Sequence, residues 1–144
     1  MRRRTAVLAS LGISVLPASA LAAAPSLDAA VRVWAGEATP RDGRVTLAIA
    51  ELVENGNAVP VTVRVDSPMT AEAHVTEIAL FNERNPQRDV VRFHLGLANG
   101  RAEVSTRIRL ATSQQLVALA RMNDGSVWQH RVAVLVTLAA CVEG

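Results

Sequence analysis

Residues 102–110 read AEVSTRIRL, and this stretch decides the class of fold because inward and outward side chains alternate along its whole length. Successive side chains of an extended chain point to opposite faces, so a period of two is typical of a β-strand with one buried face. The set expected to be buried is Ala102, Val104, Thr106, Ile108 and Leu110. The stretch therefore predicts a strand that covers a core and leaves Arg107 and Arg109 on a solvated face.

The pattern continues on both sides of this stretch. Further strands are predicted at 45–49, 59–65, 74–81, 91–95, 115–122 and 128–138. One face of the last strand is expected to carry Trp128, His130, Val132, Val134, Val136 and Leu138. Residues 74–81 are apolar on both parities, which predicts a bulge or two covered faces. Pro60 has no N–H for a sheet ladder, so we expect it at a strand start or on an edge.

Turn signals separate the predicted strands. Glu54–Asn57 and Asn99–Gly100 contain Asn-Gly pairs, and Asp124–Gly125 predicts a two-residue hairpin turn, since these residues tolerate positive φ at little cost. About seven strands with turns roughly every 8 to 12 residues predict an all-β fold, an immunoglobulin-like antiparallel β-sandwich, with a small barrel as the alternative. The Cys–Trp–Cys pattern of antibody domains is absent, so the prediction concerns architecture only.

A short helix is expected before the first strand. Residues 28–35 (DAAVRVWA) fit a helix with Asp28 as N-cap, Gly36 as terminator and Trp34 as the anchoring side chain. Residues 39–44 predict a turn-rich linker. The expected organisation is an export signal in 1–24, a short helix and linker in 25–44, the β-sandwich domain in 45–138 and a C-terminal tail in 139–144.

The N-terminal segment has the features of an export signal. Arg2 to Arg4 are followed by an 11-residue apolar stretch, Ala6–Leu16, and then by two small-residue cleavage sites, Ala18–Ala20 and Ala20–Ala22. As a helix the apolar stretch would span roughly 16 Å, about half of the ~30 Å hydrocarbon core. The paired Arg3 and Arg4 favour the twin-arginine route over the general one. The segment predicts a periplasmic protein without a membrane span.

The signal also accounts for the positive charge of the chain. The 144 residues include 15 basic residues, all arginine, and 13 acidic ones, for a formal charge of +2. Three arginines lie in the signal, so the remaining chain has 15 − 3 = 12 Arg against 13 acidic residues and a charge of 12 − 13 = −1. It has two Phe and two Trp and no basic stripe. These features give no support to a nucleic-acid partner.

The sequence offers few residues for a metal or a hydrolytic site. His74, His94 and His130 are widely spaced, and each is expected to be a surface residue or one with its hydrogen bonds satisfied. A blue-copper site needs one Cys, two His and usually an axial Met. Only three residues follow Cys141, which leaves no room for a downstream His and Met. No nucleophile elbow, phosphate loop or paired-carboxylate motif is present, and nothing points to a Ser-His-Asp triad. We therefore expect no metal site and no cofactor.

Cys141 is the only thiol of the chain and lies three residues from its end. Oxidising compartments normally pair cysteines, and this one has no partner in its own chain. A functional thiol on a short exposed tail and an inert or intermolecularly bonded cysteine are both open interpretations. Glu143 and the terminal carboxylate disfavour ionisation of the thiol. This fits a carrier whose thiol is activated by a partner better than a self-sufficient catalyst.

From about Val45 to Cys141 the chain resembles the SoxY family, the sulfur-carrier subunit of the bacterial thiosulfate-oxidising Sox system. The stretches that carry the resemblance are ENGNAVPV (54–61), VDSPM (65–69), NP (85–86), RFHLG (92–96), AEVSTRIRLA (102–111) and the terminal Cys. The resemblance implies an immunoglobulin-like sandwich, a twin-arginine signal, and sulfur intermediates carried covalently on Cys141. It implies a carrier protein on which partner enzymes act, and not an independent enzyme.

The resemblance also implies a set of partners. A SoxZ-like subunit forms a heterodimer with the carrier, a SoxAX-type haem enzyme joins thiosulfate to the cysteine, a SoxB-type hydrolase releases sulfate, and a molybdenum sulfur dehydrogenase oxidises the remaining sulfur. The family usually places its cysteine in a Gly-Gly-Cys-Gly-Gly tail, whereas residues 139–144 read AACVEG. Ala and Val restrict a backbone that Gly leaves free. The alternative is therefore a non-catalytic immunoglobulin-like binding module, a paralogue that has lost sulfur carriage.

Overall fold

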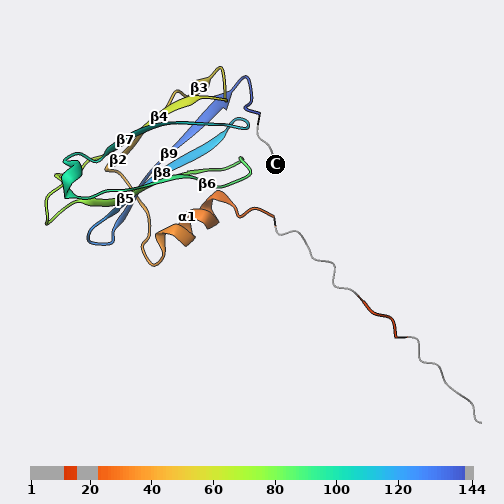
Figure 1. Ribbon diagram of the computed structural model, residues 1–144, viewed down its shortest axis with the longest axis horizontal. Coiled ribbons are helices and arrows are strands. Elements are labelled where there is room, and N and C mark those ends of the chain that lie inside the picture. Colours follow the sequence, from red (N-terminus) through yellow and green to blue (C-terminus); the bar gives the residue numbers. More distant parts are fainter. Residues whose placement is uncertain (1–11, 16–22, 142–144) are drawn as a thin grey trace, which may run out of the picture.

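The computed structural model describes residues 12–15 and 23–141, and the chain there forms two β-sheets packed face to face (Figure 1). The larger sheet has the strand order β1-β9-β8-β5-β6, with β3 also paired to β9, and the smaller sheet has the order β2-β4-β7. The elements are α1 (Leu27–Ala35), β1 (Arg41–Asp42), β2 (Val45–Ala48), β3 (Leu52–Val53), β4 (Val59–Val65), β5 (Val75–Asn82), β6 (Asp89–His94), a 3₁₀ turn (Leu97–Asn99), β7 (Glu103–Ile108), β8 (Gln114–Met122) and β9 (Val127–Val136). The predicted all-β sandwich is confirmed.

The core lies between the two sheets and is built from the alternating positions. The odd-numbered valines of β4 are buried, and Ala102, Ile108 and Leu110 in and beside β7 join them. Leu116 of β8 and Ile78 of β5 face these residues from the larger sheet and are fully buried. Each such side chain removed from water contributes about 1.5–3 kcal/mol. The period of two in β4 and β7 is thus the record of one buried face in each of these strands.

The larger sheet is covered on both faces, which explains why β5 is apolar on both parities. Ile78 and Leu80 face the smaller sheet, whereas Ala79 and Phe81 pack with α1 in a second apolar cluster. The pairing of β5 also shifts register at two places, between Val75 and Glu77 and between Leu80 and Phe81. Both features expected of this stretch, a bulge and two covered faces, are present.

Helix α1 begins one residue earlier than expected. Its N-cap is Ser26, whose hydroxyl accepts the Ala29 N–H at 3.1 Å, and not Asp28. Asp28 lies in the first turn, where its carboxylate pairs with Arg131 at 2.9 Å. Serine is one of the preferred N-cap residues, because its hydroxyl accepts a backbone N–H that has no partner within the helix. An acidic residue in the first turn interacts favourably with the positive end of the helix dipole. The predicted end at Gly36 is confirmed, since its φ is 66°.

Trp34 anchors α1 to the larger sheet. Its indole Nε1 donates to Glu77 at 3.0 Å, and the Arg121 guanidinium lies 4.5 Å from its ring centroid. We expect Trp34→Phe to lower the free energy of unfolding by about 1–3 kcal/mol, because the hydrogen bond and part of the packing are lost. Urea denaturation checks this value, and Val33→Ala on the exposed face of the same helix is the control, expected within about 0.5 kcal/mol of wild type. Equal losses in the two variants would contradict the anchoring role.

The connection through Asn99–Gly100 is not the expected hairpin. Strand β6 pairs with β5 in the larger sheet, whereas β7 pairs with β4 in the smaller one. The intervening residues form the 3₁₀ turn, which ends at Gly100 with a φ of 64°. The glycine supplies the left-handed conformation that the sequence indicated, but the turn carries the chain from one sheet to the other.

The hairpin between β8 and β9 is confirmed with a longer loop than predicted. Three residues, Asn123 to Gly125, separate Met122 from Ser126, which are joined by a backbone hydrogen bond of 2.9 Å. Gly125 has a φ of 85°, as expected for a three-residue hairpin loop that ends in a left-handed residue. Beyond β9, Leu138 is 60% exposed and does not continue the buried face predicted for the last strand.

Two short strands pair in parallel with β9 and depart from the predicted antiparallel pattern. Strand β1 lies within the expected linker and pairs with Trp128 and Gln129. Strand β3 pairs with Leu135 and Val136 at the other end of β9. A two-residue strand is too short for any sequence period to show. Strand β3 matters for the site because it places residues 54–58 beside the C-terminal segment.

The expected export signal falls mostly outside the described residues, which include only 12–15 and 23–24 of it. Within the described ranges, no helix is long and apolar enough to cross a membrane.

Candidate functional site

Cys141 is exposed, and the backbone that leads to it is fixed to the end of the sandwich. After β9 ends, residues 137–141, here called the docked segment, run beside β3 toward the C-terminus (Figure 1). Thr137 N–H donates to the Val53 carbonyl at 2.9 Å, and the Leu138 carbonyl accepts the Gly56 N–H at 2.8 Å. The backbone of the C-terminal tail is therefore hydrogen-bonded to the sandwich as far as the cysteine.

The last two residues of the docked segment are held by two different parts of the fold. Ala140 N–H donates to the Leu110 carbonyl at 3.0 Å, and Cys141 N–H donates to the Asn57 side-chain oxygen at 3.1 Å. Ala140 is 8% exposed and Leu110 is fully buried. The thiol thus follows a buried alanine and stands at the surface where the docked segment meets the 54–58 turn.

Gly56 is required at the centre of this contact. It is buried, and a Cβ built on it would lie 2.9 Å from Ala140 N, 3.1 Å from the Leu138 oxygen and closer still to the Leu110 oxygen. All three neighbours are backbone atoms, which have little freedom to move. The sequence prediction that this glycine serves a positive φ is wrong, because Gly56 is not among the positive-φ residues. Its role is the close approach of three backbone segments.

Two asparagines complete the turn. The Asn55 side-chain oxygen accepts both the backbone N–H of Asn57 at 3.0 Å and its side-chain NH₂ at 3.1 Å. With its NH₂ directed at Asn55, the amide of Asn57 has its oxygen free to accept from Cys141. The orientation of the Asn57 side chain is therefore set by Asn55. The ENGN sequence was predicted only as a turn, and its long-range contact to the C-terminus has no local sequence signal.

The three histidines lie in different parts of the fold, His74 just before β5, His94 at the end of β6 and His130 within β9. The His130 Nδ1 accepts the Leu47 N–H at 2.9 Å, and His74 Nδ1 contacts the Thr70 carbonyl oxygen at 2.9 Å. His94 is exposed at the end of β6. Among residues 12–15 and 23–141, no three His, Cys, Asp or Glu side chains form a group that could hold a metal ion.

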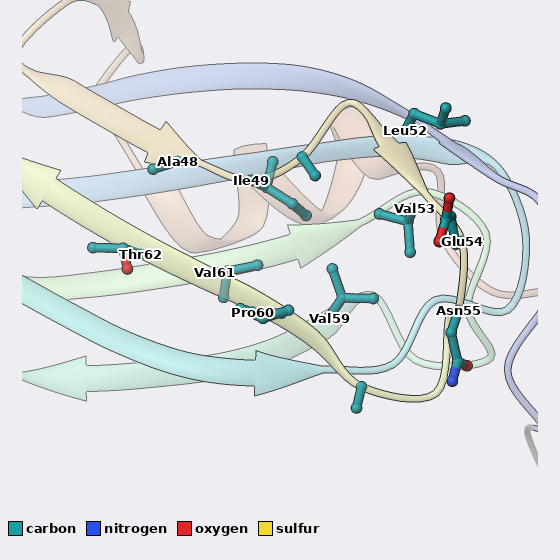
Figure 2. A pocket seen from close by; sticks show the side chains of 12 residues that line it. Ala48, Ile49, Leu52, Val53, Glu54, Asn55, Val59, Pro60, Val61 and Thr62 are labelled. Carbon is teal, nitrogen blue, oxygen red and sulfur yellow. The ribbon is translucent and has the colours of Figure 1, made fainter.

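An apolar groove of about 620 Å³ lies beside the 54–58 turn, which contributes part of its lining (Figure 2). The groove forms because β2 ends at Ala48, which pairs with Thr62, whereas the antiparallel strand β4 extends past this pair back to its first residue, Val59. Figure 2 shows Ile49, Val53, Val59 and other apolar side chains from the β2–β3 connection and from β4 around this space. Its lining residues are Ala48, Ile49, Ala50, Leu52, Val53, Glu54, Asn55, Ala58, Val59, Pro60, Val61 and Thr62. Pro60 is the second residue of β4, as its missing N–H predicted.

Three exposed leucines lie beside the groove and the docked segment. Leu52 is paired in register with Leu135, and the two are 59% and 64% exposed. Leu138, in the docked segment, is the third, and we call these three residues the leucine corner. The strand pairing places Leu52 next to Leu135, and neighbouring exposed apolar side chains mark surfaces that bind other molecules. The sequence analysis assigned Leu138 to a buried face and did not single out the other two.

These features define an immunoglobulin-like β-sandwich protein whose lone thiol is exposed at the C-terminal end. The family model for sulfur oxidation protein SoxY matches residues 31–141, and the chain belongs to the SoxY family. The predicted resemblance is thereby confirmed, and the protein is a member of a family of sulfur-oxidation proteins. The family match includes Cys141 at its last position.

Solved structures give the same result. The structure of the sulfur carrier protein SoxY from Chlorobium limicola f thiosulfatophilum is 29% identical, with a TM-score of 0.65 over 78% of this chain and 97% of that one. A superoxide reductase (neelaredoxin) from Ignicoccus hospitalis matches at 19% identity and a TM-score of 0.59, over 65% of this chain and 80% of that one. The superoxide reductase from Nanoarchaeum equitans matches at 12% identity and 0.56, over 67% and 99%. The last two show the fold alone. No curated protein matches the sequence.

Proposed function

We propose that the protein is a periplasmic carrier in thiosulfate oxidation that binds sulfur intermediates covalently on Cys141 and presents them to partner enzymes. The observation that carries the proposal is the position of the only thiol, exposed at the end of a SoxY-family domain. A carrier's reactive atom must be accessible to several enzymes in turn, and a side chain at the chain end on the rim of the fold meets that need.

The proposed reactions begin with a disulfide-type bond between the Cys141 sulfur and the substrate. In the first step a sulfur–sulfur bond forms between Cys141 and thiosulfate, the thiol loses its proton, and an electron pair passes to a SoxAX-type haem enzyme. In the second step a SoxB-type hydrolase adds water to the sulfonate, sulfate and a proton leave, and a persulfide remains on Cys141. A molybdenum sulfur dehydrogenase then oxidises the outer sulfur of the persulfide to a sulfonate, with oxygen from water and with the electrons passing to that enzyme and the protons to solvent. The hydrolase adds water once more, sulfate leaves, and the free thiol of Cys141 is restored. Each reaction is supplied by a partner, so the carrier itself needs no cofactor and is not an independent enzyme.

Apolar surface next to the thiol supports the proposed partnerships. The groove is lined in part by Glu54, Asn55 and Ala58 of the turn that holds Cys141, and Leu52 belongs both to the groove lining and to the leucine corner. A SoxZ-like subunit, in a heterodimer, or the enzymes that act on the thiol would bury such surface on binding. The alternative function, a non-catalytic binding module, would use the same surface without the thiol, and it is favoured by the AACVEG tail in place of the glycine-rich one.

Peptide mass spectrometry tests the proposal. Trypsin cleaves after Arg131, which releases Val132–Gly144 with Cys141 inside it. In protein recovered from cells that oxidise thiosulfate, this peptide is expected to carry thiosulfonate and persulfide masses that are absent without thiosulfate. If the peptide is unmodified in cells that turn thiosulfate over at full rate, the binding module is the correct function.

The export signal proposed for residues 1–24 gives a further prediction. Twin-arginine transport depends on the arginine pair and not only on positive charge, so Arg3→Lys together with Arg4→Lys is expected to retain the precursor in the cytoplasm. Cell fractionation and immunoblotting measure the precursor and the shorter mature chain, and the control is Arg2→Lys, which leaves the pair intact. Normal export of the double variant would show the general route instead.

A further inference from the structure

The hydrogen bonds that hold the docked segment differ in the kind of acceptor, and this difference singles out Asn57. Residues 137, 138 and 140 are held by bonds whose acceptors are backbone carbonyls or whose carbonyl accepts a backbone N–H, and the Thr137 hydroxyl also donates to the Val53 and Glu54 carbonyls. At Cys141 the acceptor is a side chain, the Asn57 amide. A side-chain acceptor can be removed by substitution while the backbone of both segments stays the same. Asn57 is exposed, so its removal leaves no cavity.

The position of Cys141 is consequently set by a short relay of side chains. Asn55 orients Asn57, and Asn57 accepts from the Cys141 backbone. A free arm that begins after Leu138 could carry the cysteine roughly 10 Å at ~3.5 Å per residue. With Asn57 bound to the Cys141 N–H, the backbone at Cys141 stays where the turn places it, and only the side chain of the cysteine is free to rotate.

We propose that Asn57 is a positioning residue that presents the Cys141 thiol at a fixed place on the rim, so that partner enzymes bind the sulfur as a preorganised surface feature. This inference rests on the proposed function and adds the way in which the thiol is offered. It also gives a physical reason for a tail without glycines, because Ala139 and Ala140 reduce the conformational freedom that docking must overcome. Preorganisation lowers the entropic cost of binding a partner and therefore acts on KM.

The experiment compares Asn57→Ala with Asn123→Ala. The side-chain oxygen of Asn123 also accepts a backbone N–H, that of His74, at 3.0 Å. Asn123 lies in the β8–β9 loop, and among the described residues it makes no hydrogen bond to the docked segment. In the isolated protein, hydrogen exchange of the Cys141 amide is expected to be about threefold to tenfold faster in Asn57→Ala and unchanged in Asn123→Ala. Asn55→Ala, which removes only the support of Asn57, is expected to fall between them.

A kinetic measurement separates positioning from a merely structural role. For enzymes acting on loaded carrier, Asn57→Ala is expected to raise KM for the carrier about threefold to tenfold while kcat and the melting temperature stay at wild-type values. Unchanged exchange or unchanged KM would overturn the proposal. The hydrogen-exchange result does not depend on sulfur chemistry. Faster exchange in Asn57→Ala, combined with a Val132–Gly144 peptide that never carries sulfur, would support the positioning of Cys141 by Asn57 and refute only the carrier function.

Discussion

Cys141→Ser is expected to reduce carrier-dependent sulfate formation from thiosulfate to the background rate. A serine oxygen cannot form the sulfur–sulfur bond on which the proposed cycle depends, and the hydroxyl is a far weaker nucleophile than a thiolate. The substitution changes one exposed atom, so the free energy of unfolding is expected to stay within about 0.5 kcal/mol of wild type. Sulfate formation by the reconstituted system measures the first effect, and urea denaturation measures the second.

Two controls make this result specific. Ser113→Ala alters a hydroxyl that bonds the Val136 backbone at the end of β9, near the docked segment, and is expected to keep sulfate formation intact. Partner binding by Cys141→Ser is expected to be unchanged, because the proposed contact surface is the groove and the leucine corner. Full sulfate formation by the serine variant would favour the binding module and remove the role of the thiol.

Gly56→Ala is expected to lower the free energy of unfolding by about 1–3 kcal/mol, toward the upper end of that range. The added Cβ would lie within 3.1 Å of Ala140 N and the Leu138 oxygen, and closer to the Leu110 oxygen. Because these atoms belong to backbone, no side chain can rotate away to make room. The docked segment is therefore expected to separate from the turn, with faster hydrogen exchange at the Ala140 amide.

The matched control is Gly96→Ala. Gly96 has an extended backbone, with φ −132° and ψ 177°, and a Cβ there meets nothing within 4 Å. Alanine at such a position is expected to be neutral or to stabilise the protein by up to about 1 kcal/mol, because it restricts the unfolded chain. Urea denaturation of both variants tests the difference. Equal stabilities would show that the three backbone segments can separate without cost, contrary to the close contact at Gly56.

The strands of the smaller sheet were predictable because each buries one face, whereas β5 of the larger sheet was predictable from its apolar residues on both parities. The alternation of β7 and of the valines in β4 records that burial directly in the sequence. The assignment of strands to sheets was not predictable from local signals, since Asn99–Gly100 can end a hairpin or carry the chain between sheets. The parallel strands β1 and β3 are two residues long and leave no period. Helix α1 was predictable from its ends, although Ser26 and Asp28 compete as caps.

The candidate site was predictable only in part. Cys141 followed from being the only thiol near a chain end. The hydrogen bonds that hold its backbone, however, depend on contacts between distant residues, Gly56 with Leu110 (110 − 56 = 54 positions) and Asn57 with Cys141 (141 − 57 = 84 positions). Asn-Gly is a common turn signal, which concealed the packing role of Gly56. The leucine corner was hidden because Leu52, Leu135 and Leu138 look like core residues until their strands are placed at the rim.

The most direct test of the carrier function is a single-turnover measurement on the Val132–Gly144 peptide. The loaded protein is mixed with the sulfur-oxidising partners, quenched at intervals and digested with trypsin, and the modified and free forms of Cys141 are quantified by mass spectrometry. We expect the thiosulfonate on Cys141 to disappear at least as fast as sulfate forms, with the persulfide appearing in its place. A thiosulfonate that persists while sulfate accumulates would contradict the account, because the modified cysteine would then be a side product and not the carrier.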